Sequence, residues 1–189
     1  MANKIRYGLK NTHYAIVTET ADSTTGEITS TYTTPAPWPG SVSLSLDPQG
    51  EDSPFYADDG VYAMLTSNTG YQGEFRSAQV PEDVETDVFG QTKDSTTGMV
   101  TEKSTDTKKY IALMFEFDGD ANKRRWVMYR CMLTRPPIAS NTREANITPQ
   151  TASVTITATP RPDDNAVQSH CEETDSAYAN WYSAVPVAA

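Results

Sequence analysis

Few residues of this chain carry the side chains that enzymes use for chemistry, and those few stand apart. His13 and His170 are its two histidines, and neither lies near a serine or cysteine nucleophile signature. Cys131 and Cys171 have no further cysteine or histidine at the spacing of a zinc site. We therefore expect no catalytic residue, no cofactor and no metal, and the chain is not predicted to be an enzyme.

Two acidic stretches begin like functional motifs without meeting their requirements. The segment DGDAN at 118–122 starts like a calcium loop, but Lys123 stands where that loop needs glycine and Tyr129 where it needs a bidentate glutamate. Asp58 and Asp59 are adjacent, so an extended chain directs their carboxylates to opposite faces. The sequence predicts neither a calcium site nor a catalytic carboxylate pair.

The composition indicates a single globular domain over residues 1–189 with an acidic surface. Of 189 residues, 37% are apolar and 10% aromatic, which suffices for a core, and the formal net charge is -10. That charge opposes binding to nucleic acid or to anionic lipid. The basic cluster at 123–125 is interpreted either as a solvated hairpin end or as a contact for a partner protein.

The sequence carries no signal for a membrane or for secretion. No stretch approaches the ~18 apolar residues that cross a bilayer. The first residues, MANKIRYG, lack the apolar segment of a secretory signal. We expect synthesis in a reducing cytoplasm, both cysteines as free structural thiols, and no glycosylation of the NIT motif at 146–148.

Alternating polar and apolar residues predict that the chain is mainly β, most clearly at 41–47 and 153–159. Segments 110–118 and 124–133 flank a turn cluster and predict a long hairpin. The second arm is apolar on both faces, with Trp126, Met128 and Met132 on one side, so it must be covered twice. Further strands are expected at 12–20, 27–33, 60–68 and 71–79.

Helical spacing occurs in two segments. Residues 81–90 place Pro81 at a first helical position and Gly90 as a stop. Residues 174–185 repeat aromatic and apolar side chains at three- and four-residue intervals, which predicts a C-terminal helix.

The pentapeptide DSTTG occurs at 22–26 and again at 94–98, between segments that do not match each other. We interpret it as one hairpin turn used twice, with the glycine at positive φ. Segments 91–107 and 135–150 are polar and are predicted to be extended excursions.

Six stretches, in order along the chain, resemble one family. They are YGLKNTHYA near the start, PGSVSLSLDPQGEDSPFYADDGVY at 39–62, PEDVETDVFG at 81–90, FEFDGD at 115–120, TITATPRPD at 155–163 and NWYSAV at 180–185. Together they resemble the major tail proteins of long-tailed bacteriophages, the phi13-type tail tube proteins. Segments 20–34 and 91–107, which hold the two DSTTG turns, are the least similar to that family.

The resemblance implies a β-sandwich or barrel-like tail tube fold with one flanking short helix and a C-terminal helix. It implies a structural virion protein that assembles in the host cytoplasm into stacked, hexameric rings forming the tail tube. The implied partners are further copies of the chain, the tape-measure protein, and the tail terminator and distal tail proteins. Double-stranded DNA would pass as non-specific cargo, and an acidic lumen would not hold it, because duplex carries one negative charge per ~1.7 Å.

Residues 47–60 combine acids with two aromatic side chains. We expect this stretch to be a long loop that touches a neighbouring subunit or ring, with Phe55 and Tyr56 as buried anchors. The alternative folds both side chains into the protomer's own core. The predicted contact residues are Asp47, Pro48, Pro54, Phe55, Tyr56, Asp58 and Asp59, together with Trp126, Met128 and Met132 of the doubly apolar strand.

The rival function is a β-sandwich carbohydrate-binding or adhesion module. Trp38, Trp126 and Trp181 would then form an exposed platform on which sugars stack. The positions of Trp126 and Trp181 in apolar patterns favour packing instead.

Overall fold

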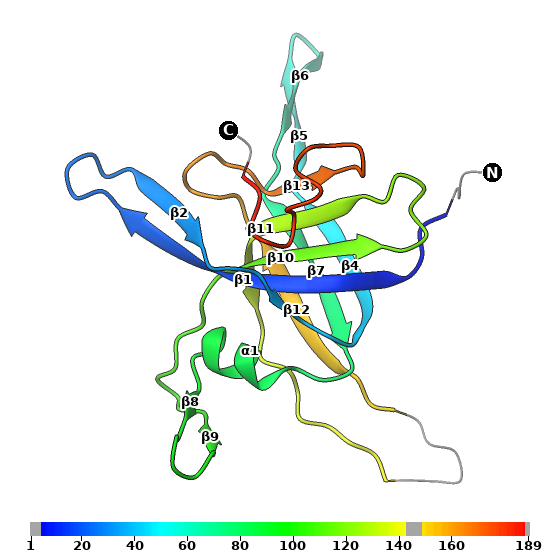
Figure 1. The fold of residues 1–189 in the computed structure, drawn as a ribbon. Coiled ribbons are helices and arrows are strands. Elements are labelled where there is room, and N and C mark those ends of the chain that lie inside the picture. Colours follow the sequence, from blue (N-terminus) through cyan, green and yellow to red (C-terminus); the bar gives the residue numbers. More distant parts are fainter. Residues whose placement is uncertain (1–4, 143–148, 188–189) are drawn as a thin grey trace.

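Antiparallel pairing joins most strands of the computed structural model into one curled sheet, and a short helix lies beside it (Figure 1). The structure describes residues 5–142 and 149–187, so the NIT motif at 146–148 lies outside the described residues. The elements are β1 (Leu9–Ala21), β2 (Ile28–Tyr32), β3 (Ala36–Pro37), β4 (Ser41–Gln49), β5 (Asp52–Ala57), β6 (Gly60–Thr66), β7 (Gly70–Ser77), α1 (Glu82–Asp87), β8 (Thr92–Lys93), β9 (Val100–Thr101), β10 (Ile111–Phe117), β11 (Arg125–Leu133), β12 (Ala152–Ala158) and β13 (Gln168–Cys171). The predicted mainly β, sandwich-like class is confirmed.

The sheet runs in the order β2-β1-β10-β11-β12-β7-β4. It curls so that β4 and β7 face β10 and β11 across the main core, which Leu44, Phe75, Phe115 and Met128 help to fill. Both end strands keep one side free of strand partners within the described chain, since β2 pairs only with β1 and β4 only with β7. The sandwich is therefore open at two strand edges.

A second apolar cluster covers the other face of β10 and β11. Met114, Val127 and Tyr129 lie on this face, and the C-terminal segment covers them with Trp181. The expected double covering of the 124–133 strand is therefore confirmed. Both covers come from the protomer itself, so the expectation that a neighbouring subunit covers one face of this strand is wrong.

The predicted alternation along β11 is wrong beyond Tyr129. Ile111 pairs with Cys131 and Leu113 with Met128, so β11 carries one extra residue against β10. Such a bulge reverses the direction of the side chains that follow it. Cys131 and Leu133 therefore join Met128 in the main core.

The helix expected at 81–90 is confirmed as α1, which buries Val84 against the main core. Pro81 is its N-cap and not its first helical residue, and Gly90 ends the segment at φ +77°. The described part of the chain contains no helix long and apolar enough to cross a membrane.

The predicted C-terminal helix at 174–185 is wrong. This segment is a chain of tight turns, in which the N–H of Tyr178 donates to Asp175, that of Trp181 to Tyr178 and that of Ser183 to Asn180. A helix would bond the Tyr178 carbonyl to the N–H of Tyr182. Here Nη1 of Arg125 donates to that carbonyl at 2.6 Å, and the apolar side chains still reach the second cluster.

The two DSTTG segments form the same turn, as predicted. Asp22 accepts from the N–H groups of Thr24 and Thr25 at 2.7 and 3.0 Å, and Asp94 accepts from Thr96 and Thr97 at the same distances. The backbone N–H of Thr25 and that of Thr97 are the largest causes that lower the pKa of Asp22 and Asp94. The turns close two exposed arms, β1–β2 and β8–β9 (Figure 1).

Replacing Gly26 with alanine should destabilise the protein by about 1 kcal/mol, because Gly26 has φ +72° and a Cβ there strains the backbone. No atom lies within 4 Å of the added Cβ, so the cost is conformational and not steric. Gly60→Ala is the matched control, since its position is equally open and its φ is not positive. Urea unfolding of both variants checks this prediction, and equal stabilities would contradict it.

Candidate assembly surface

The segment expected as a loop at 47–60 is mostly strand. β4 continues to Gln49, and β5 then pairs with β6 in a separate two-stranded sheet. Asp58 and Asp59 form the connecting turn, with φ of 50° and 62°, the left-handed conformation of a two-residue hairpin turn. The sequence DDG between alternating segments is a signal from which this hairpin could have been predicted.

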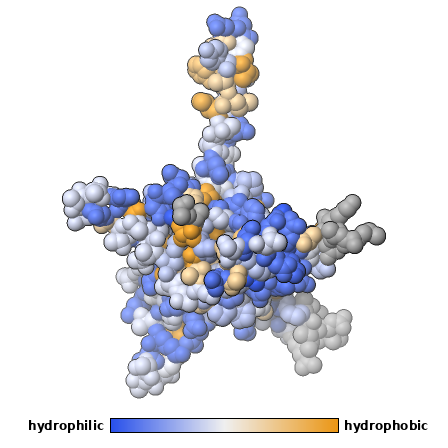
Figure 2. All heavy atoms as spheres, turned by 45° about the horizontal axis from the view of Figure 1, so that its top comes forward, coloured by the Kyte–Doolittle hydropathy of each residue, from blue (hydrophilic) through white to orange (hydrophobic). Residues whose placement is uncertain are grey.

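Residues 52–66, here called the projecting hairpin, stand away from the body of the molecule (Figure 1). Figure 2 shows apolar side chains gathered along this arm. Phe55 is 54% exposed and Tyr56 is 67% exposed. The alternative that folds both side chains into the protomer's own core is therefore wrong.

The hairpin exposes more apolar side chains than the sequence reasoning had selected. Those on β6 are Val61, Tyr62, Met64 and Leu65. Phe55 and Tyr62 pack edge to face, with ring centroids 6.4 Å apart. An isolated two-stranded hairpin is only marginally stable in water, and a concentrated apolar surface of this kind marks an interaction site.

The predicted contact residues of β4 lie at the base of the hairpin. Asp47 is exposed. Pro48 lies on β4, the edge strand, and pairs with Tyr71 of β7. An edge strand tolerates the missing N–H of proline. Beside them the outward face of β4, β7 and β12 is polar, and its exposed residues include Ser43, Ser45, Asp47, Gln72, Glu74 and Thr155. This face carries small hydroxyls, amides and acids, and also Arg76, whose guanidinium pairs with Glu74 at 3.2 Å.

The contact residues predicted on β11 lie elsewhere and are not exposed. Met128 is 3% exposed inside the main core, so it offers no surface to a neighbour, contrary to the prediction. Met132 and Trp126 are half-buried, and Trp126 stacks on His170 with centroids 4.5 Å apart. The β11 residues therefore do not join the hairpin in one surface.

The basic cluster at 123–125 is paired with acids of the same chain, while Lys123 stays exposed at the hairpin end. Lys123 pairs with Glu173 at 2.6 Å and Arg124 with Glu172 at 3.0 Å. Arg125 is largely buried and pairs with Glu116 at 2.9 Å. The pairs of Lys123 and Arg124 join the β10–β11 turn to the C-terminal segment, and the pair of Arg125 joins β11 to β10.

The predicted tryptophan platform for sugars is wrong. Trp38 and Trp181 are 1% and 2% exposed. Trp38 instead packs edge to face on Phe75, with centroids 5.1 Å apart. No stacking surface remains for a carbohydrate at these positions.

The two histidines and the two cysteines are each packed against other side chains. Within residues 5–142 and 149–187, no group of three or more histidine, cysteine or acidic side chains could hold a metal ion. His13 packs against Tyr182, with centroids 4.4 Å apart. Both cysteines are free, as predicted, and burial raises the pKa of Cys131 to about 12 and also raises that of Cys171.

Both thiols should resist modification in the native protein, because only the thiolate reacts and both sulfurs are buried. With Ellman's reagent at pH 8 we expect native protein to release no thionitrobenzoate within an hour. After unfolding in guanidinium chloride, two thiols per chain should react. A thiol that reacts rapidly in the folded protein would contradict the packing described for β11 and β13.

No family model matches this chain, and no curated protein matches it.

Proposed function

We propose that this chain is a structural subunit that polymerises with itself into stacked rings, forming the tail tube of a long-tailed bacteriophage. The observation that carries the proposal is the projecting hairpin, whose apolar side chains the protomer leaves uncovered. A protein that stays monomeric would leave this apolar surface exposed to water, whereas a subunit of an assembly would bury it against the next copy. The kind of assembly, a tail tube, is proposed from the sequence stretches that resemble phage major tail proteins.

The free edges of β2 and β4 support closure into a ring. Exposed strand edges invite pairing with other chains. In a ring, a contact between two different surfaces repeats by rotation and uses every copy of both. Hexameric symmetry is taken from the resemblance alone.

The polar outward face of β4, β7 and β12 suits the wall of a conduit. Six copies would carry six times the formal charge of -10, and Asp47 lies on this face beside the ion pair of Glu74 with Arg76. DNA would be repelled and so pass without binding. The tape-measure, tail terminator and distal tail proteins are the further partners proposed, and the virion tail is the proposed location.

Sedimentation velocity over a series of protein concentrations and salt concentrations tests this function against the rival binding module. A tube subunit should shift from a protomer to large species as its concentration rises. Added salt should favour the large species, because it screens the repulsion between acidic copies. A binding module should sediment as a protomer throughout. Protomers alone at every concentration and salt would contradict the proposal.

A further inference from the structure

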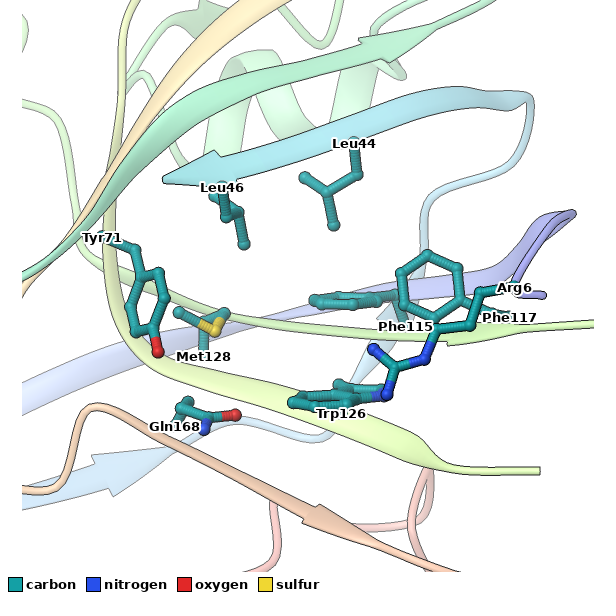
Figure 3. A pocket seen from close by; sticks show the side chains of 9 residues that line it. All are labelled: Arg6, Leu44, Leu46, Tyr71, Phe115, Phe117, Trp126, Met128 and Gln168. Atoms are coloured by element: carbon teal, nitrogen blue, oxygen red, sulfur yellow. The ribbon is translucent and has the colours of Figure 1, made fainter. Parts of the chain in front are cut away.

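An apolar pocket opens in the main core between β4 and β10–β11. It is partly open to solvent and holds about 190 Å³ of accessible space. Figure 3 shows Leu44 and Leu46 pointing from β4 toward the facing aromatic side chains, with Arg6 beside Trp126. The lining residues are Arg6, Leu44, Leu46, Tyr71, Phe115, Phe117, Trp126, Met128 and Gln168. This space is smaller than the roughly 300–1,000 Å³ of a small-molecule site, so it suits a large side chain.

The lining of this pocket contains unused hydrogen-bonding groups. Nε1 of Trp126 and Oε1 of Gln168 are buried without a hydrogen-bond partner. One is a donor and the other an acceptor. A buried polar group without a partner costs roughly 1–3 kcal/mol, so a ligand that supplies both a donor and an acceptor would fit this pocket. A tyrosine hydroxyl does so at the end of an apolar ring.

We propose that this pocket receives the tip of the projecting hairpin from a second copy of the chain, with Tyr62 and Phe55 as the inserted side chains. Tyr62 is 71% exposed and packs on Phe55. The two rings together form one protruding apolar group, and Tyr62 adds a hydroxyl to it. This inference rests on the proposed function, and it names the surface that the hairpin reaches.

Charge and reach agree with this occupant. Arg6 lines the pocket with its side chain half exposed and pairs with Asp120 at 3.8 Å, and Asp58 and Asp59 in the hairpin turn would be further acidic partners for it. β5 has six residues, which span roughly 20 Å at about 3.4 Å per residue. Because the hairpin rises away from its own body (Figure 1), it reaches the pocket of another copy and not its own. The contact joins two different surfaces, so it can repeat from copy to copy.

Photo-crosslinking tests the contact in the full chain. With p-benzoyl-L-phenylalanine in place of Tyr62, irradiation of a mixture of ¹⁵N-labelled and unlabelled copies should join the hairpin of one copy to segment 44–46 or 126–128 of another. The same substitution at Met99, which is 64% exposed on the β8–β9 arm, is the control and should give no crosslink to the pocket. Crosslinks from position 62 only to other surfaces, or only within one copy, would overturn the inference.

A variant that fills the pocket gives a second test with an intact hairpin. Leu44→Trp should lower the yield of pocket crosslinks from position 62 at least tenfold. Val42→Trp places the same bulk on the exposed side of β4 and should leave the yield unchanged. Equal yields in the two variants would overturn the inference.

The outcomes separate this contact from the proposed tube. Annular assemblies whose crosslinks avoid the pocket would support the proposed tube and contradict the pocket contact. Pocket crosslinks between copies that never form annuli would support the pocket contact and contradict the proposed tube.

Discussion

We expect the Phe55→Ser, Tyr56→Ser double variant to fold normally and to fail to assemble. Both side chains are more than half exposed in the protomer, so their loss removes little intramolecular packing. An aromatic anchor at the centre of an interface contributes about 2 kcal/mol or more, and 1.4 kcal/mol is a tenfold change in affinity. The concentration needed for assembly should therefore rise at least a hundredfold.

Light scattering at increasing concentration measures this threshold, and circular dichroism reports the fold. The control is Met99→Ser, which removes an equally exposed apolar side chain from the β8–β9 arm. Assemblies of normal length from the double variant at the usual concentration would show that the hairpin is not the contact.

Replacing Glu116 with alanine should destabilise the protomer by about 3–5 kcal/mol, the range observed when one partner of a buried ion pair is removed. Glu116 is 7% exposed and joins several parts of the chain. Its carboxylate accepts from Asn11 at 2.5 Å, from Arg125 at 2.9 Å and from Tyr182 at 3.4 Å. Its loss leaves the guanidinium of Arg125 largely buried without its carboxylate.

Urea unfolding in the Phe55→Ser, Tyr56→Ser background measures this loss without a contribution from self-association. Glu82→Ala is the control, because the ion pair between Glu82 and Lys93 is about half exposed on both sides and should contribute less than about 1 kcal/mol. Similar losses in the two variants would contradict the role of Glu116 as the link between β1, β10, β11 and the C-terminal segment.

Strand positions were predictable because alternation is a local property. The segments 41–47 and 153–159 alternate strictly, and the observed strands are Ser41–Gln49 and Ala152–Ala158. The DSTTG turns were predictable for the same reason, since one aspartate and one glycine determine each turn. These features depend on few residues that are close together in the chain.

The errors arose where distant partners decide the structure. The spacing at 174–185 suits a helix, but Arg125 takes the carbonyl of Tyr178 and consecutive turns satisfy the same apolar spacing. The side-chain directions after Tyr129 depend on a bulge in the pairing of β10 with β11, which no local pattern records.

For the candidate site, the sequence reasoning found the acidic, aromatic segment at 47–60 and missed its partner strand. The acids around Phe55 and Tyr56 distinguish these two side chains, whereas the sequence predicts only a strand at 60–68 for Val61, Tyr62, Met64 and Leu65. Alternation predicts that a strand exists but not which sheet it joins. The separate pairing of β5 with β6 is what exposes both arms.

The most direct test of the central claim is negative-stain electron microscopy of the purified full chain at increasing concentration and at several salt concentrations. If copies of this chain complete one another through the projecting hairpin, the images should contain annuli with a central hole and tubes built from stacked annuli. Fields of separate, compact particles under every condition would contradict the claim.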